Sequence, residues 1–491
     1  MLCAAVVTAL WACGVRKLAP PVGGPRQVVQ TRFHQSVNRD LDLLFVVDDS
    51  ISMEPLQTKM AARLRDFMEV LKGVDGGLPN LHVAVISTSL GAGRFGDVGG
   101  CGNGTAGNSS GVFQHRAACT MLHAGEKFIS SVADARAPNG RINNFDGDIA
   151  DAFSCIAQLG QGGCGFEHQF ENTKLALMRA QNASDSFNGG FLRPDAYLAI
   201  VMVTNEDDCS VPEDSVLLDP RVQTLTDVSS EPGPLNGVAL GVLQSYRCNE
   251  FGHRCGGMKP PHNPLAAPTP LDGCTSAEDG VLVKVSDFVA FLKTLKPDRP
   301  DRLLMAALAG PTGPYVIETV TEKISTGALV SHPAIGHSCV EPTADPLKPE
   351  YGDPAIRVKQ WLDAFPNSVL QSICADDFRQ SMQKIAEAIS NRIGAPCLEG
   401  DIATNRDNAP DCDVTERVTN ASASSGFVDK TVRFCPPGRT GTDATHPCWE
   451  LVASPRCAGG QMLQLCYDVG CTQAARPTNT TDALVSCALA P

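Results

Sequence analysis

Short apolar runs recur along most of the chain and alternate with longer segments in which apolar residues return at helical spacing. A near-continuous apolar run is typical of a strand that is covered on both faces. Such runs predict strands at Leu43–Val47, Leu81–Ser87, Tyr197–Val203, Arg302–Leu308 and Val369–Cys374. The amphipathic segments predict helices at 54–72, 145–159, 168–181, 281–295, 355–364 and 377–393. This alternation indicates an α/β layer fold with a mostly parallel sheet.

The pattern also divides the chain into segments. Residues 41–394 carry the alternation, with excursions at about 88–125 and 209–280 that contain cysteines. Structureless loops of that length are unusual unless they are functional or stapled. Within the second excursion, residues 235–248 predict a short extra helix. Residues 395–491 hold eight cysteines and short strand-like pieces, which predicts a small cysteine-rich module, mostly β and loop, with too little apolar content for its own core.

Cysteine usage and the first residues indicate the compartment. Twenty cysteines, none in a CxxC pair, favour structural disulfides in an oxidising compartment over zinc or redox sites. The start, MLCAAVVTALWACG, resembles the end of a bacterial lipoprotein signal (residues 1–13), with Cys13 as the lipidated residue. Trp11 is bulky for such a signal and no basic residue precedes the apolar run, so an ordinary cleaved signal stays open. Residues 14–40 are expected to be a linker.

Charge excludes two classes of partner. The formal net charge of −14 argues against a nucleic acid and against electrostatic docking on anionic lipid. We therefore expect membrane contact only through a lipid at Cys13, which would place the protein in the cell envelope, in the periplasm or on the outer membrane.

The first predicted strand ends in a polar sequence, DDSIS, directly before a predicted helix. Asp48, Ser50 and Ser52 present a carboxylate and two hydroxyls at intervals of two residues. In open parallel sheets, ligands bind beyond the carboxyl ends of the strands. Because Mg²⁺ prefers oxygen ligands, these side chains predict half of a magnesium site. The alternative is that Ser50 and Ser52 simply cap the helix.

A strand, a DxSxS sequence, a long helix and further strand–helix units resemble the von Willebrand factor type A (VWA) domain and its metal-ion-dependent adhesion site (MIDAS). The resemblance covers about residues 41–394, with the two excursions as insertions. It implies a three-layer, Rossmann-like α/β domain in which a second loop supplies a Thr and a third loop an Asp. It also implies metal-dependent binding of a protein whose acidic residue completes the coordination of the ion.

This chain departs from the family pattern in both of the other loops. Glu167 stands where the family has its Thr, and Asn205 stands where it has its Asp, with Glu206 beside it. A carboxylate gained on one loop offsets the one lost on the other, which keeps the site suitable for Mg²⁺, or for Ca²⁺ or Mn²⁺. The expected metal ligands are Asp48, Ser50, Ser52, Glu167, Asn205 and Glu206. Cys155 and Cys164 bracket a Gly-rich turn and are expected to pair, with more distant partners left open.

The sequence therefore predicts a non-catalytic envelope protein that adheres to a protein partner, one presenting an acidic residue, through a divalent cation. One alternative is a structural scaffold whose metal site is inactive or self-occupied, which Glu167 and Asn205 favour. A second is a hydrolase with its active site in an insertion or in the C-terminal module, although no HExxH motif occurs. Stability that rises with Mg²⁺ would separate the first interpretation from the scaffold.

Overall fold

The structure is a computed structural model. It describes residues 28–34, 39–74, 77–92, 94–95, 98, 101, 110–115, 117–134, 136–137, 139–297, 299–324, 327–343, 350–393, 397–398, 401–419, 422–423, 427–453, 461–471 and 480–490. Contacts within the chain divide it into two units: a central unit, residues 35–396, and a terminal unit, residues 1–34 together with 397–491. Cys13 and most of the expected linker lie outside the described residues.

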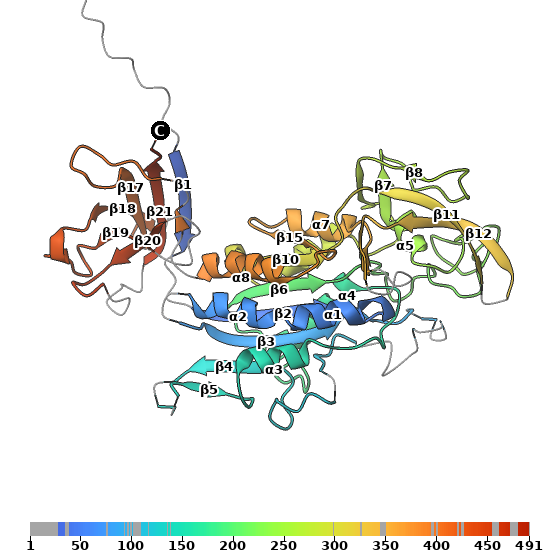
Figure 1. The fold of residues 1–491 in the computed structure, drawn as a ribbon, viewed down its shortest axis with the longest axis horizontal. Helices are drawn as coiled ribbons and strands as arrows, with labels where there is room; N and C mark the ends of the chain where they lie inside the picture. The colour runs from blue at the N-terminus through green and yellow to red at the C-terminus, as the bar shows by residue number, and fades with distance from the viewer. Residues whose placement is uncertain are drawn as a thin grey trace, which may run out of the picture. The chain divides into compact units, whose positions relative to one another are not determined.

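The central unit is built on a seven-stranded sheet with the order β15-β10-β6-β2-β3-β4-β5 (Figure 1). From β15 to β3 the strands are parallel, whereas β4 pairs antiparallel with both β3 and β5. The strands are β2 (Asp40–Val47), β3 (Asn80–Ser87), β4 (Ile129–Ala133), β5 (Arg141–Asn143), β6 (Tyr197–Val203), β10 (Leu303–Ala309) and β15 (Val369–Ser372). The sheet is therefore mixed.

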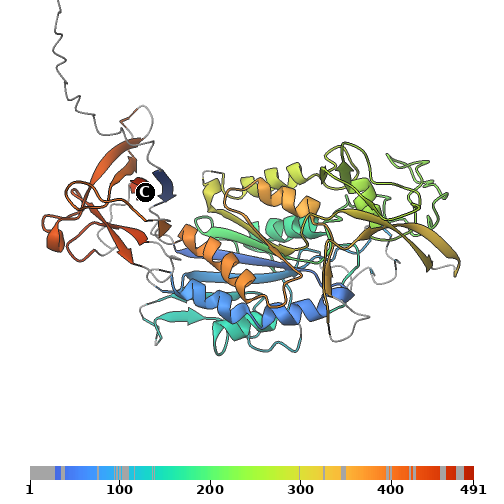
Figure 2. The same cartoon turned by 45° about the horizontal axis from the view of Figure 1, so that its top comes forward.

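Helices cover both faces of this sheet (Figure 2). They are α1 (Glu54–Ala61), α2 (Leu64–Lys72), α3 (Ile149–Ile156), α4 (Gln169–Gln181), α6 (Val285–Thr294), α7 (Ile356–Asp363) and α8 (Arg379–Ile393). Successive side chains of a strand point to opposite faces. Leu43, Phe45 and Val47 accordingly pack in a core with α1, α2, α3 and α8, whereas Leu44 and Val46 pack in a second core with α4, α6 and α7.

The second excursion is a folded insertion with its own helix, α5 (Tyr246–Gly252), and it packs in a small core together with Cys101 and Phe166. The disulfides Cys209–Cys248 and Cys255–Cys274 staple it. Within it, β7 (His253–Cys255) pairs with β9 (Cys274–Ser276), and its strand β8 (Thr269–Pro270) pairs with β11 (Val316–Lys323). Further along the chain, β11 forms a hairpin with β12 (Leu329–Gly336), and β13 (Cys339–Glu341) pairs with β14 (Glu350–Gly352). The expected helix at 235–248 is thus displaced, because α5 begins only at Tyr246.

The terminal unit is a second seven-stranded sheet, with the order β1-β21-β17-β18-β19-β20-β16. Its strands are β1 (Val28–His34), β16 (Cys397–Leu398), β17 (Cys412–Thr419), β18 (Phe427–Phe434), β19 (Cys448–Ala453), β20 (Gln461–Cys466) and β21 (Thr480–Ala488). Val414, Val432, Trp449 and Leu463 belong to a buried cluster, so the unit has a core of its own, contrary to expectation. Because β1 pairs with β21, part of the expected linker is a strand.

The predicted fold class is wrong for this chain. The sequence predicts a three-layer, Rossmann-like α/β domain with a mostly parallel sheet and a minor C-terminal module. In the described residues the protein is instead mostly β, with twenty-one strands, eight short α-helices and a mixed central sheet. Half of the strands of the two seven-stranded sheets lie in the terminal unit, where apolar residues alternate with polar ones and the sequence predicts only short strand-like pieces.

The expected Cys155–Cys164 disulfide is also wrong. Cys164 pairs with Cys101, and Cys155 pairs with Cys119. Both cysteines of the Gly-rich turn are thus tied to the first excursion, a pairing that spacing along the chain could not show. Among the described residues, none of the helices combines the length and apolar character needed to cross a membrane.

Candidate functional site: an acidic cluster at the strand ends

The polar residues at the ends of three neighbouring strands meet at one edge of the central sheet. In the parallel register, Val47 of β2 pairs with Ser87 of β3 and with Val203 of β6. The next residue on each strand is therefore at the same level, which places Asp48, Thr88 and Thr204 side by side. This is the edge at which parallel sheets bind ligands.

Loop one carries the DxSxS sequence. The Asp48 side chain is fully buried, and its Oδ1 accepts a hydrogen bond of 2.9 Å from the backbone N–H of Ser50. Ser50 Oγ lies 3.2 Å from Ser52 Oγ. A short 3₁₀ turn, Ile51–Met53, follows and leads into α1; neither Ser hydroxyl caps a helix, so the capping alternative does not describe them.

Loop three follows β6 and joins the same cluster. Thr204 Oγ1 donates a hydrogen bond of 2.8 Å to Asp48 Oδ2. Ser52 Oγ lies 3.3 Å from Asn205 Oδ1. The structure thus brings four of the six predicted ligand residues, Asp48, Ser50, Ser52 and Asn205, into one hydrogen-bonded chain.

Loop two brings Glu167, just before α4. Glu167 is 1% exposed, and its Oε2 accepts a hydrogen bond from the Thr88 hydroxyl. Its other oxygen, Oε1, is buried without a hydrogen-bond partner among the described residues. The loop is held against loop one, because Gly163 N–H donates to the Asp49 carbonyl at 2.8 Å and a Cβ at this glycine would collide with the Asp49 carboxylate.

Burial and mutual repulsion make these carboxyl groups reluctant to ionise. Burial raises the pKa of Glu167 well above its usual range, and the charges of Asp48 and Glu206 raise it further. The pKa of Glu206 is also raised well above its usual range, by burial and then by the charges of Asp353 and Asp48. Burial raises the pKa of Asp48, and burial with the charge of Asp48 raises the pKa of Asp49 to about 6. The cluster therefore gathers carboxyl groups in a dry environment where their charged forms are costly.

The oxygen spacings fit a hard cation. Neighbouring ligands of an octahedral Mg²⁺ ion stand about 3 Å apart, since each lies ~2.1 Å from the metal. The Ser50–Ser52 and Ser52–Asn205 separations, 3.2 and 3.3 Å, are close to that value. Carboxylates alone do not surround an ion at this site. Among the described residues, groups of three Asp, Glu, His or Cys ligand atoms within 4.8 Å of one another occur only around Cys466, whose sulfur is in a disulfide. Hydroxyl, amide and water oxygens would have to complete the shell.

A strap that no sequence pattern indicates covers this edge. Tyr351, on β14, lies close enough to Ser52 for the serine side chain to affect its pKa, which burial and the nearby charge of Glu206 raise. His337 stacks on the Tyr351 ring at 3.9 Å between centroids, and its Nδ1 lies 2.6 Å from Asp353 Oδ1. The residues of this strap, 337–343 and 350–353, are far from the DxSxS sequence along the chain, and no local pattern connects the two.

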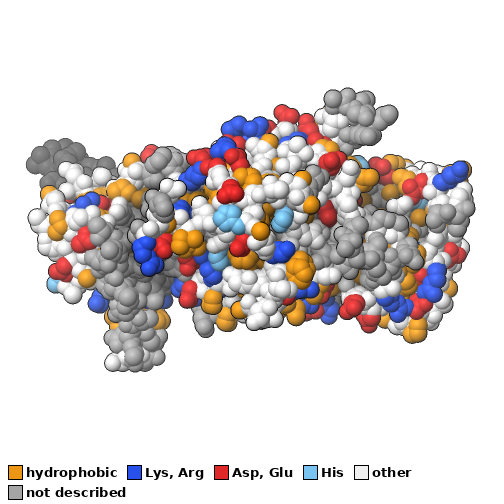
Figure 3. Space-filling view, turned by 90° about the horizontal axis from the view of Figure 1, so that it is seen from below, with side chains coloured by type: hydrophobic (Ala, Val, Ile, Leu, Met, Phe, Trp, Pro, Cys, Tyr) orange, Lys and Arg blue, Asp and Glu red, His pale blue; other side chains and the backbone are white. Residues whose placement is uncertain are grey.

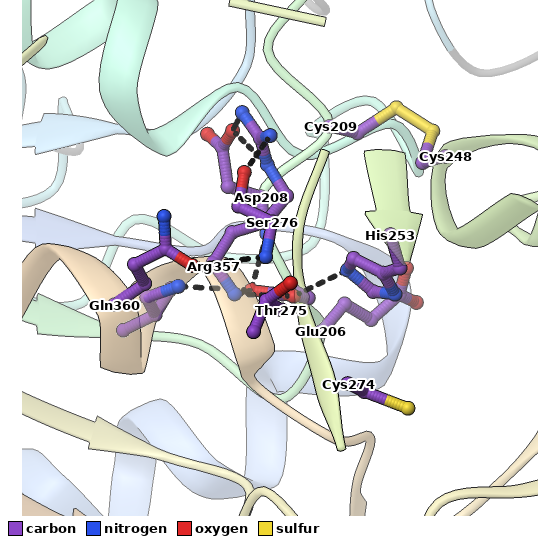
Figure 4. Close-up of polar contacts among 12 residues, drawn as sticks. Glu206, Asp208, Cys209, Cys248, His253, Cys274, Thr275, Ser276, Arg357 and Gln360 are labelled. Atoms are coloured by element: carbon purple, nitrogen blue, oxygen red, sulfur yellow. Dashed lines mark hydrogen bonds and ion pairs between the residues drawn. A yellow bond between two sulfur atoms is a disulfide. The ribbon is translucent and has the colours of Figure 1, made fainter. Parts of the chain in front are cut away.

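The acids behind loop three, Asp207 and Asp208, are buried. Asp208 forms an ion pair with Arg357 in which both side chains are fully buried, and Arg357 Nη1 also donates to Ser276 Oγ at 2.9 Å (Figure 4). Asp207 Oδ2 lies 2.9 Å from His253 Nε2. Together with the Cys209–Cys248 disulfide, these contacts fix the position of Asn205 and Glu206.

Charge is dispersed on one face of the molecule. On the face drawn in Figure 3, acidic and basic side chains are interspersed among apolar ones, without a continuous basic area in the part of the chain that is described there.

The fold and the site define a disulfide-rich, mostly β protein with a buried acidic cluster at its strand ends. No protein-family model and no curated protein matches the sequence. The pilus adhesin SpaC from Lactobacillus rhamnosus GG, in its open conformation, is 11% identical with a TM-score of 0.29, and the match covers 94% of this chain and 40% of SpaC. The adhesive tip pilin GBS104 from Group B Streptococcus agalactiae is 11% identical with a TM-score of 0.27, covering 94% of this chain and 81% of the pilin. This chain thus spans about two fifths of the length of SpaC. At these TM-scores the likeness carries no argument about function.

Proposed function

We propose that this chain is a non-catalytic protein of the cell envelope that binds a protein partner through a divalent cation, Mg²⁺ in the first place, held at the strand-end cluster. The ligands would come from Asp48, Ser50, Ser52, Glu167, Asn205 and Glu206. A bound cation would supply positive charge at the cluster and a coordination position for an acidic residue of the partner. Adhesion to another protein is the role that such a site supports.

The observation that carries this proposal is the unpartnered Oε1 of Glu167, which has no hydrogen bond among the described residues. A buried carboxylate oxygen without a hydrogen bond is costly, and a buried charge is costly unless it is paired. Asp48 and Glu206 lie close enough to raise the pKa of Glu167 by repulsion. A divalent cation would offset much of this negative charge, which gives a physical reason for keeping the three acids together.

The chain's own residues would orient such a site. Thr204 and the Ser50 backbone hold the two oxygens of Asp48 in place. Thr88 holds one oxygen of Glu167 and leaves the other available. Ser52 lies at the outer side of the cluster, next to Ile51, which is 78% exposed, so a partner would approach from this side.

The disulfides support a location outside the cytosol. Eight disulfides join described cysteines, and such density is typical of proteins from oxidising compartments. Anchoring through a lipid on Cys13 is part of the proposal. Metabolic labelling with a fatty acid, compared between the wild type and Cys13→Ser, tests it directly.

Thermal melting after chelator treatment tests the cation site. A ligand at about 100 times its Kd stabilises the folded state by about 2.7 kcal/mol. We expect millimolar Mg²⁺ to raise the Tm of the wild type by several degrees and to leave Asp48→Asn unchanged. Asp146→Asn is the matched control, because the Asp146 side chain is 86% exposed and takes no part in the cluster. An equal shift in wild type and Asp48→Asn contradicts the proposal.

A self-occupied scaffold is the second candidate, and the closeness of the Tyr351 side chain to Ser52 favours it. In that case the strap itself takes the position of the partner, and no cation is needed at the outer edge. The absence of any Mg²⁺ effect on the wild type in the melting experiment would select this alternative.

A further inference from the structure

A cavity of about 710 Å³ opens in the terminal unit, between β17, β18 and residues 441–447. Cavities that bind small ligands in proteins usually measure about 300–1,000 Å³. All of its described lining residues belong to the terminal unit, so the cavity is independent of the strand-end cluster.

The cavity begins where the core of the terminal unit stops being apolar. Val414 and Val432 face each other across β17 and β18 and are both buried in the core. One step along the same face, the facing pair is Glu416 and Lys430. Side chains two residues apart share a face of a strand, so this charged pair continues the row that the two valines begin. Charged side chains do not complete an apolar core, because burying them is costly. The cavity lies next to this pair.

The Glu416 carboxylate is a fixed hydrogen-bond acceptor in the wall of the cavity. It is only 3% exposed, and its Oε1 accepts a hydrogen bond of 2.7 Å from the hydroxyl of Tyr467, a side chain that is 1% exposed. A fixed carboxylate of this kind accepts hydrogen bonds from hydroxyl groups of a ligand.

The rim of the cavity is cationic. Lys430, Arg433 and His446 line it, and all three are exposed. Arg433 Nη2 donates to the Gly441 carbonyl at 2.8 Å, which fixes the guanidinium against the loop that forms the opposite wall. The two charged groups Lys430 and Arg433 lie at one opening, in a chain with a net charge of −14. They favour a ligand that carries a negative charge at that end.

We propose that this cavity binds an acidic saccharide, a short chain of uronic-acid units. The sugar carboxylate would pair with Lys430 and Arg433 at the rim. The ring hydroxyls would donate to Glu416 and meet the Thr431 and Thr445 hydroxyls, and the carbon face of the ring would rest on Val418. A purely anionic ligand does not fit, because the Glu416 carboxylate repels it; the ligand needs hydroxyls at one end and an acid at the other.

Calorimetric titration of the full chain with trigalacturonate, against the neutral galactotriose, tests this proposal. We expect trigalacturonate to bind at least tenfold more tightly than galactotriose, and added salt to weaken it. Lys430→Gln and Glu416→Gln should each weaken trigalacturonate by about tenfold, since each removes a hydrogen bond to a charged group. Lys384→Gln, an exposed change of equal charge on α8, should leave the affinity unchanged.

Equal affinity for the acidic and neutral sugars, or no binding of trigalacturonate at millimolar concentration, overturns the proposal. So does binding that Lys430→Gln leaves intact while the variant melts like the wild type. A chelator and Asp48→Asn should not change the affinity, so this test and that of the cation site fail or succeed separately.

Discussion

The hydroxyl of Thr204 donates a hydrogen bond of 2.8 Å to Oδ2 of Asp48, and so joins the ends of two neighbouring parallel strands. Thr204 is fully buried, and the same hydroxyl lies 3.1 Å from Gln169 Nε2 at the start of α4. One threonine thus connects all three loops of the acidic cluster. Its role is to hold the Asp48 carboxylate in a fixed orientation.

Thr204→Val should therefore destabilise the protein by about 1.5–3 kcal/mol, because a hydrogen bond to a charged group is lost without a change of shape. Urea unfolding measures this loss. Thr321→Val is the control, since Thr321 is on β11 and its hydroxyl bonds another exposed hydroxyl, that of Ser331. A cost for Thr204→Val no larger than that of the control would show that the contact does not hold the cluster.

Much of this cluster could be predicted from the sequence, because the features that place it are local. The apolar runs locate β2, β3 and β6 to within a few residues, and the polar residues after them are visible in the sequence. Thr88 and Tyr351 were missed. Thr88 follows β3 in an ordinary polar stretch, and Tyr351 reaches Ser52 only through the tertiary fold.

Other strands, such as β11 and β1, could not be predicted for a different reason. In β11, exposed and part-buried residues surround a single buried Ile317, so no apolar run marks the strand. β1 finds its partner, β21, near the opposite end of the chain. The pairing of Cys155 with Cys119 likewise depends on how the first excursion folds back, which sequence spacing does not encode.

Arg357 offers a second prediction. Its ion pair with Asp208 is fully buried, with 2.9 Å between Nη2 and Oδ2. Arg357→Met leaves a buried carboxylate without its cation and should cost about 3–5 kcal/mol. Adding Asp208→Asn to this variant should restore part of the loss. Lys359→Met, which breaks an exposed pair with Asp363 on the same helix, should cost less than about 1 kcal/mol. Equal unfolding free energies for the Arg357 and Lys359 variants would contradict the prediction.

Opposed pKa shifts at the other end of β2 predict a specific pH dependence. Burial raises the pKa of Asp42 to about 6, even though Arg193 and Lys296 oppose the rise. Burial lowers the pKa of His82 to about 4, and its Nδ1 lies 3.6 Å from Asp42 Oδ1. Compared with the unfolded chain, the folded protein thus keeps a proton on Asp42 and lacks one on His82 over much the same pH range.

Between about pH 4 and 6, the raised pKa of Asp42 makes stability fall as the pH rises, whereas the lowered pKa of His82 makes it rise. The two slopes largely cancel in the wild type. Asp42→Asn should therefore gain stability with rising pH, by up to about 3 kcal/mol over this range, and His82→Gln should lose a similar amount. Urea unfolding at half-unit pH steps measures both slopes. Parallel curves for the wild type and the two variants would refute the assignment.

Tyr351 gives the sharpest test of whether a cation binds beside Ser52. Terbium(III) takes oxygen ligands as Ca²⁺ does, and it emits strongly only when an excited aromatic ring lies within several ångströms. Tyr351 lies near enough to Ser52 for that side chain to affect its pKa, so a terbium ion at the cluster would lie close to this ring. Excitation of tyrosine should then produce terbium emission that Mg²⁺ suppresses by competition.

Tyr351→Phe should lose most of this emission while keeping the Mg²⁺-dependent rise in Tm, and Asp48→Asn should lose both. Tyr467→Phe, in the terminal unit, is the matched control and should keep the emission. Emission that survives Tyr351→Phe, or that Asp48→Asn leaves unchanged, would place the ion elsewhere and remove the support for a cation at this edge.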